Sequence, residues 1–204
     1  RNYKVAFLLI PEVKDDAIVM SESAAKSTQF DLITKTELVI NKNDVLLNIY
    51  GDMQNYKSFP MVGEMISDKG ILLATRKMEK KNLSADFTDM ALQNIYYTDN
   101  KFGAHGKIVD IDIAVNDVEE LTTDLHRQQL AEIYNDQFRY NEEIVNILQP
   151  IVNNRNNRTT DRLENELFNA RNYITPNIKY SSNTGNFEFA HITIYTCETQ
   201  CLTQ

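Results

Sequence analysis

The clearest hydrophobic pattern in the chain is a strict alternation over residues 107–115. Its apolar positions are Val109, Ile111, Ile113 and Val115, and the intervening positions are Asp110, Asp112 and Ala114. Successive side chains of a β-strand point to opposite faces of the sheet. The alternation therefore predicts a strand with one buried face and one solvated face.

A helical periodicity follows this strand and extends over residues 117–149. Asn116 is a typical N-cap residue, and Glu119 completes the pattern of a capping box. The apolar stripe changes phase near Arg127, which predicts a kink or a break in the helix at that point. Pro150 is expected to end the helix, because its ring disfavours the helical conformation of the preceding residue.

Two further segments have helical character. Residues 161–174 repeat apolar side chains at helical spacing, and these are Leu163, Leu167, Phe168 and Ala170. Pro176 is expected to end this helix, so that residues 117–174 form a helical hairpin. A shorter helix is predicted from an N-cap at Ser84 to Tyr97. Residues 14–30 fit either a helix or a strand.

The remaining apolar runs are typical of strands. They comprise residues 3–10, 34–40, 44–50 and 71–74. The second and third are separated by Asn41, Lys42 and Asn43, which predicts a β-hairpin. A second hairpin is predicted at the C-terminus, where a polar turn separates residues 178–182 from residues 187–196.

Taken as a set, these elements predict an α+β fold with a mainly antiparallel sheet. A helical layer covers one face and includes the long helix at about 117–149. The chain closes with a C-terminal β-hairpin, whose last strand is expected to pair with an early strand. A chain of 204 residues fits one globular domain over residues 1–204, with the helical hairpin 117–174 as a sub-region.

Composition and net charge limit the classes of partner that the chain is expected to bind. The chain is 42% hydrophobic and 25% charged, which is ordinary for a globular protein. Its net charge of −8 repels phosphate, so the sequence predicts no nucleic-acid partner. The chain begins with Arg1 rather than Met, which favours a mature or trimmed product. We expect an extracytoplasmic or secreted location, although the sequence leaves the compartment open.

The most specific chemical signal is the string His191-Ile192-Thr193-Ile194. It resembles the His-x-Thr-x motif of the 2H phosphoesterases, which act on phosphodiester bonds in RNA ends and cyclic nucleotides. The resemblance implies that His191 transfers a proton and that Thr193 holds a phosphate oxygen. That family needs two such motifs. Neither His105 nor His126 is followed two residues later by Ser or Thr, so the second motif is missing.

Metal binding is the other chemistry to weigh. Asp110 and Asp112 have the spacing of a Mg²⁺ or Mn²⁺ site, but alternation alone explains them as the solvated face of a strand. A zinc site of His191, Cys197 and Cys201 requires ligands that converge. In an extended strand the first two lie about 20 Å apart. The sequence predicts no metal and no cofactor, and leaves a disulfide and two free thiols equally open.

Two polar segments are candidates for contact with an acidic partner or an anionic lipid surface. They are the basic run at residues 76–81 and the Asn/Arg-rich loop at residues 153–158. Both are explained more simply as ordinary solvent-exposed segments.

Three functional hypotheses follow from these observations. The first is a non-enzymatic interaction or binding module with a protein partner, of a secreted, surface or assembly-associated kind. The second is a phosphodiester hydrolase built on His191 and Thr193. The third is a protein that binds lipid or a membrane surface through its helical layer.

Overall fold

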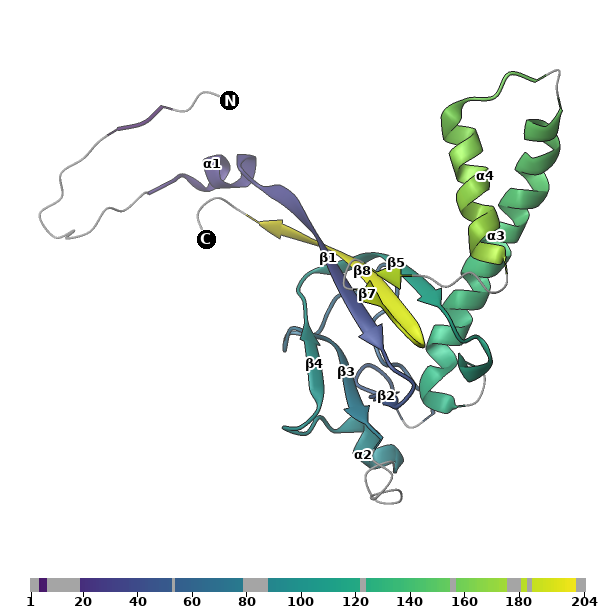
Figure 1. Cartoon of the computed structure of the whole chain (residues 1–204). Helices are drawn as coiled ribbons and strands as arrows, with labels where there is room; N and C mark the ends of the chain where they lie inside the picture. The colour runs from purple at the N-terminus through teal and green to yellow at the C-terminus, as the bar shows by residue number, and fades with distance from the viewer. Residues whose placement is uncertain are drawn as a thin grey trace, which may run out of the picture.

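A computed structural model shows an α+β protein (Figure 1). The structure describes residues 4–6, 19–52, 54–78, 88–121, 124–154, 157–175, 181–182 and 185–200. The strand predicted over residues 3–10 lies outside this part of the chain except for residues 4–6, which have no regular secondary structure.

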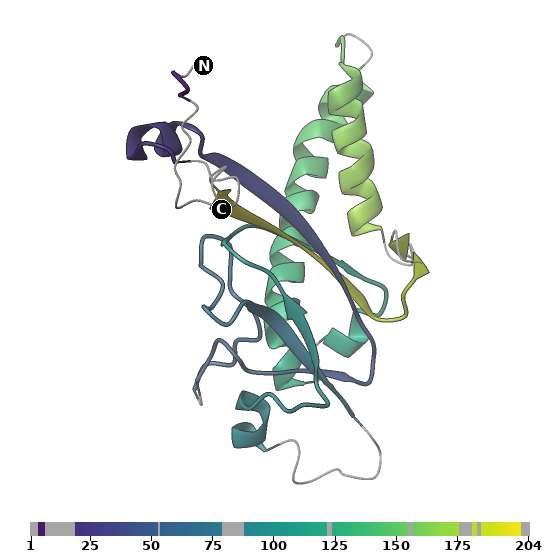
Figure 2. The ribbon, with the colours of Figure 1, turned by 90° about the vertical axis from the view of Figure 1, so that its left-hand side faces the viewer.

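A three-stranded antiparallel sheet organises the molecule, with strand order β1-β8-β5. The central strand β8 (Ala190–Gln200) pairs with β1 (Phe30–Ile40) along all 11 residues, and the two run side by side in Figure 2. On its other side β8 pairs antiparallel with β5 (Lys107–Val115). The last strand therefore returns to an early strand, as predicted.

The predicted C-terminal β-hairpin is wrong. Within the described part of the chain, β6 (Ser181–Ser182) pairs with β7 (Gly185–Asn186), and β8 belongs to a different sheet. The side chains of β8 explain its central place, because Ala190, Ile192 and Ile194 are fully buried. A strand buried to this extent needs partners for its backbone groups on both edges, and a hairpin supplies only one.

The hairpin predicted around Asn41–Asn43 is also wrong. β2 (Asp44–Leu46) joins a second three-stranded sheet of order β2-β3-β4, formed with β3 (Ile71–Lys77) and β4 (Asn100–Gly103). The Asp44 carboxylate accepts hydrogen bonds from the backbone and side chain of Asn41, at 3.0 and 2.8 Å. This turn carries the chain from one sheet to the other, and the largest core cluster draws side chains from both sheets.

β5 confirms the strand predicted over residues 107–115, except that Val109 lies on the exposed face instead of the buried one. Val109 is 45% exposed, whereas Ile108 is buried. The pairing with β8 shifts between Ile108 and Asp110, which marks a β-bulge. An extra residue in one strand reverses the alternation on one side of it, so the strict pattern holds only from Asp110 onward.

The long helix begins later than predicted. Two 3-10 turns, η1 (Glu119–Leu121) and η2 (Leu125–Arg127), precede the 26-residue helix α3 (Gln128–Asn153). The break near Arg127 is therefore confirmed. The buried guanidinium of Arg127 donates hydrogen bonds to the carbonyl and the carboxylate of Glu120 and to the carbonyl of Lys42. Because these hydrogen bonds fix Arg127 beside Glu120 and Lys42, the chain before residue 128 does not continue as one straight α-helix.

α3 also continues through Pro150, which lies inside the helix one turn before its end. It packs against α4 (Asp161–Ile174), and the two form a small hydrophobic cluster of their own around Val145 and Leu167. The two helices project beyond the sheets (Figure 1). Phe168, which was predicted on the inner face of α4, is 63% exposed.

One short helix resolves the ambiguous segment at residues 14–30, and a second is shorter than predicted. α1 (Glu22–Ser27) is capped by the Ser21 side chain, so the segment at 14–30 contains a helix followed by the start of β1. α2 (Asp89–Gln93) is capped by Thr88 and ends at Gln93, so the helix predicted to reach Tyr97 is wrong over residues 94–97. The N-cap predicted at Ser84 lies outside the described residues. None of the helices in the described part of the chain is long and apolar enough to cross a membrane.

Candidate functional site

The sequence-predicted pair His191 and Thr193 lies on the face of β8 opposite its buried aliphatic residues. The alternation of a strand places both side chains on one face, and the register brings polar residues of the neighbouring strands beside them. Glu37 of β1 and Asp112 of β5 are the cross-strand partners of Thr193. The structure thus places the His-Thr pair and the carboxylate Asp112 on the same sheet face.

Electrostatics on this face follow from partial burial and from neighbouring charges. Loss of hydration lowers the pKa of His191, and the nearby charges of Glu37, Lys35 and Asp112 modify this effect. Loss of hydration also raises the pKa of Asp112, and the charge of Asp110 adds to that rise. The face therefore favours a neutral histidine beside a carboxylate that holds its proton more tightly than usual.

Access to this histidine is limited. His191 and Thr193 are 8% and 7% exposed, and the ring of Phe187 stacks on the imidazole with centroids 5.5 Å apart. The Nε2 atom of His191 is buried and has no hydrogen-bond partner among the described residues. A buried polar atom of this kind costs free energy, which favours a packing role for the ring.

No second histidine joins this site in the part of the chain that the structure describes. His105 lies against Gly70, and His126 lies in η2. Neither ring contributes to the electrostatics of His191. The two-motif arrangement of the 2H phosphoesterases is therefore not assembled from the described histidines, and the hydrolase hypothesis stays a prediction.

The buried imidazole leads to a prediction on stability. A folded-state pKa below the ordinary value of 6.5 means that the unfolded chain binds the proton more readily. The free energy of unfolding is therefore expected to decrease as the pH falls through this value. His191→Phe should weaken this dependence. Denaturant unfolding of both proteins above and below the histidine pKa provides the test, and identical pH profiles would contradict it.

The metal hypotheses find no support in the described residues. No group of three or more His, Cys, Asp or Glu side chains there converges in a way that suits a metal ion. One carboxylate oxygen of Asp110 accepts a hydrogen bond from the backbone N–H of Ile111. Cys197 is a half-buried free thiol on β8. Cys201 lies outside the described residues.

The basic run at residues 76–81 was expected to be exposed, but its first residue is buried. Arg76 is buried on β3 and forms an ion pair with Asp99 at 2.8 Å. Lys77 and Met78 are exposed, and residues 79–81 lie outside the described part. In the Asn/Arg loop, residues 155 and 156 are likewise not described.

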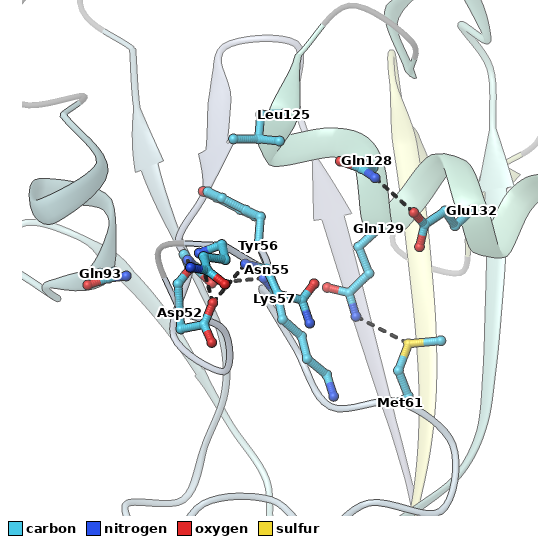
Figure 3. A pocket seen from close by; sticks show the side chains of 12 residues that line it. Asp52, Asn55, Tyr56, Lys57, Met61, Gln93, Leu125, Gln128, Gln129 and Glu132 are labelled. Atoms are coloured by element: carbon cyan, nitrogen blue, oxygen red, sulfur yellow. Dashed lines mark hydrogen bonds between the residues drawn. The ribbon is translucent and has the colours of Figure 1, made fainter.

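A pocket that the sequence did not reveal lies between the loop after β2 and the start of α3 (Figure 3). Its volume is about 310 Å³. The loop contributes one wall and the helical segment contributes the other, and Gln93 of α2 also lines the pocket. The lining residues are Asn48, Asp52, Gln54, Asn55, Tyr56, Lys57, Met61, Gln93, Leu125, Gln128, Gln129 and Glu132.

Side-chain hydrogen bonds hold the loop wall in shape. Asn48 donates to the carbonyl of Asp52 at 2.8 Å and accepts from the backbone N–H of Lys57 at 2.8 Å. A Cβ at Gly51 would lie 2.0 Å from the carbonyl oxygen of Asn55, so only glycine fits there. The loop is therefore a tightly closed turn that leaves little room for rearrangement.

A buried glutamine joins the two walls of the pocket. The Gln129 side chain accepts from the backbone N–H of Ser58 and donates to the carbonyl of Phe59, both at 2.8 Å. A buried side-chain amide that is satisfied by backbone groups on a distant segment fixes both segments relative to each other. The pocket is consequently largely preformed.

The charge inside the pocket is negative. Backbone N–H groups of Gln54 and Asn55 donate to Asp52 and lower the pKa of its carboxyl, so it is ionised at neutral pH. The Lys57 ammonium lies within 2.6 Å of both carboxylate oxygens of Glu64, which neutralises it. Glu132 accepts only a neutral hydrogen bond, from Gln128 at 3.0 Å. Among the described lining residues, two carboxylates thus face the pocket, and the cation Lys57 is paired with Glu64.

One sequence signal for this site was present. The run Asn48-Ile49-Tyr50-Gly51-Asp52 is rich in turn-forming residues, yet its apolar positions favoured a strand over residues 44–50. No protein-family model matches the chain, and no curated protein is significantly similar to it in sequence.

Proposed function

We propose that this chain is a non-enzymatic binding module and that its pocket receives a basic side chain of a protein partner. The observation that carries the proposal is the preformed pocket, whose described lining residues include two carboxylates, Asp52 and Glu132, and a lysine that is paired with Glu64. The phosphodiester-hydrolase and lipid-binding hypotheses stay untested.

Charge selects the class of ligand. A pocket with two carboxylates repels phosphates and acidic side chains and attracts ammonium or guanidinium groups. The net charge of −8 acts in the same direction at longer range, because it increases the rate at which a basic partner is encountered. Both effects disfavour nucleic acid as a partner.

The remaining lining fits a long basic side chain. Gln54, Asn55 and Gln93 make no side-chain hydrogen bond within the described residues, so their amide oxygens are available as acceptors. Tyr56 and Leu125 supply apolar surface against which an aliphatic stem can pack. A guanidinium has five N–H donors and suits this set of acceptors better than an ammonium does.

The proposal predicts selective binding of a short peptide with a central arginine. Its citrulline analogue has the same shape without the charge, and we expect it to bind at least about tenfold more weakly, or 1.4 kcal/mol. Titration followed by two-dimensional NMR should shift the side-chain amide signals of Gln54, Asn55 and Gln93. Added salt should weaken binding of the arginine peptide.

A matched pair of variants localises the effect. Glu132→Gln removes one pocket charge and should weaken arginine binding by about tenfold, since hydrogen bonds to charged groups are worth about 1.5–3 kcal/mol. Glu143→Gln removes an exposed charge elsewhere on α3 and should leave affinity unchanged. Equal affinity for the arginine and citrulline peptides would contradict the proposal, as would signal shifts confined to residues outside the pocket.

A further inference from the structure

The outer edge of β1 is an unpaired sheet edge. β1 is the terminal strand of the order β1-β8-β5, and its 11 residues pair only with β8. Among the described residues, no backbone hydrogen bond outside that pairing involves residues 30–36. The outward N–H and C=O groups of this edge therefore have no backbone partner in the described part of the chain and can pair with another strand.

The first half of this edge is exposed and carries apolar side chains, with Asp31 and Lys35 as its two charged residues. Residues 30–35 are exposed, and Ile33, Phe30 and Leu32 are 63%, 44% and 41% exposed. No proline interrupts β1. An exposed, regular and partly apolar edge of this kind is a surface for strand addition.

The sequence of this half is complementary to itself. In an antiparallel pair of β1 strands centred on Ile33, each Ile33 lies opposite its counterpart in the other copy. Residues on one face follow a period of two, so Asp31, Ile33 and Lys35 share a face. The same register sets Asp31 of each copy opposite Lys35 of the other, which forms two equivalent ion pairs. A charged pair in this position contributes to the stability of a sheet.

We infer that two copies of this chain associate through the β1 edges over residues 30–36, in an antiparallel arrangement centred on Ile33. The interface is isologous, because the same surface of each copy meets itself across a two-fold axis. It joins the two β1-β8-β5 sheets into one six-stranded sheet. This inference does not depend on the pocket, which lies on other elements.

Charges already present on this face are compatible with the pairing. Lys35 forms an ion pair with Glu37, and Asp31 accepts a hydrogen bond from the Thr199 hydroxyl at 2.7 Å. Both partners come from the same chain and lie on the same sheet, so they hold the two side chains along the face. In the dimer, Asp31 of the second copy approaches Lys35 in addition to Glu37.

The test is the mass of the protein in solution, measured by light scattering and analytical ultracentrifugation over a wide concentration range. We expect a concentration-dependent dimer. Ile33→Lys places two like charges on the two-fold axis and should give a monomer. Ile147→Lys alters an equally exposed position on α3 and should leave the dimer intact. Circular dichroism and thermal melts establish that each variant is folded.

Charge reversal distinguishes the proposed register from other interfaces. Asp31→Lys should raise the dimer dissociation constant by about tenfold or more, because it opposes two lysines. The double variant Asp31→Lys/Lys35→Asp restores opposite charges and should recover most of the affinity. A monomeric wild type overturns the inference, and so does a dimer that persists in Ile33→Lys. Peptide binding by the pocket is measured separately, so either proposal can fail alone.

Discussion

Replacing Arg76 by methionine is expected to lower the free energy of unfolding by about 3–5 kcal/mol, the cost of breaking a buried ion pair by removing one partner. The Arg76 guanidinium donates twice to the Asp99 carboxylate, at 2.9 and 2.8 Å. It also donates to the carbonyls of Ala91 and Asn94, and lies 4.1 Å from the ring centroid of Tyr96. Denaturant unfolding gives the measurement.

The state of Asp99 supports this expectation. Burial alone would raise the pKa of its carboxyl, but hydrogen bonds from Arg76 and from the backbone N–H of Tyr96 outweigh burial and lower it. Without Arg76, a buried negative charge remains with one backbone donor. The loss should be smaller at acidic pH, where the carboxyl of the variant takes up a proton.

Two controls separate this effect from the loss of a basic residue. Lys77→Met changes the next residue of the same strand, which is exposed, and should alter stability by less than about 0.5 kcal/mol. The double variant Arg76→Met/Asp99→Leu removes both charges and should recover part of the loss. A single Arg76→Met variant as stable as the wild type would show that the pair does not hold α2 and the following turn to β3.

Phe189→Ala should destabilise the protein by a similar amount, about 3–5 kcal/mol. Phe189 is fully buried in the main core cluster, immediately before β8, and the Arg127 guanidinium lies 4.4 Å from its ring centroid. Removing the ring leaves a cavity and also leaves the buried face of a cation without its aromatic contact. Thermal and denaturant unfolding should both register the loss.

Phe168→Ala is the matched control for this prediction. The same substitution is made on α4, where the side chain is 63% exposed. Little apolar area is lost from the folded state there, so stability should change by less than about 0.5 kcal/mol. Equal losses for the two variants would mean that α4 buries Phe168 against another surface in solution.

Local periodicity predicted the elements of this fold well. The alternation at 107–115 and the helical spacing at 161–174 each correspond to one observed element, β5 and α4. The change of phase near Arg127 marked the place where α3 begins. These features depend on the contrast between buried and solvated side chains within one segment. That contrast can be recognised from the order of apolar and polar residues in the segment itself.

Strand pairing was predicted less well, because it depends on residues far apart in the chain. The turn at Asn41–Asn43 has the composition of a hairpin, yet β1 and β2 enter different sheets. β8 follows a turn-like segment, yet it pairs with β1 and β5. In both cases burial of apolar side chains in the shared core outweighs the local preference for a hairpin.

The candidate sites were also predicted only in part from local sequence patterns. The period of two in a strand was enough to place His191 and Thr193 on one face. The tertiary structure alone brought Asp112 and Glu37 beside them and covered the imidazole with Phe187. Phe187 is only four residues before His191 in the sequence, and the chain bends at residues 188 and 189 between them, so that its ring stacks on the imidazole. An alternating strand pattern does not predict that bend.

The pocket is the clearest case of a feature that only the tertiary structure decides. Its walls come from residues 48–61, from Gln93 and from residues 125–132, and the buried Gln129 holds the two main walls together. By itself, the sequence determined which segments form strands and helices and which of their faces are apolar, because those properties repeat over a few residues. Which strands pair, which edge stays open and which polar groups converge depend on how distant segments share one core.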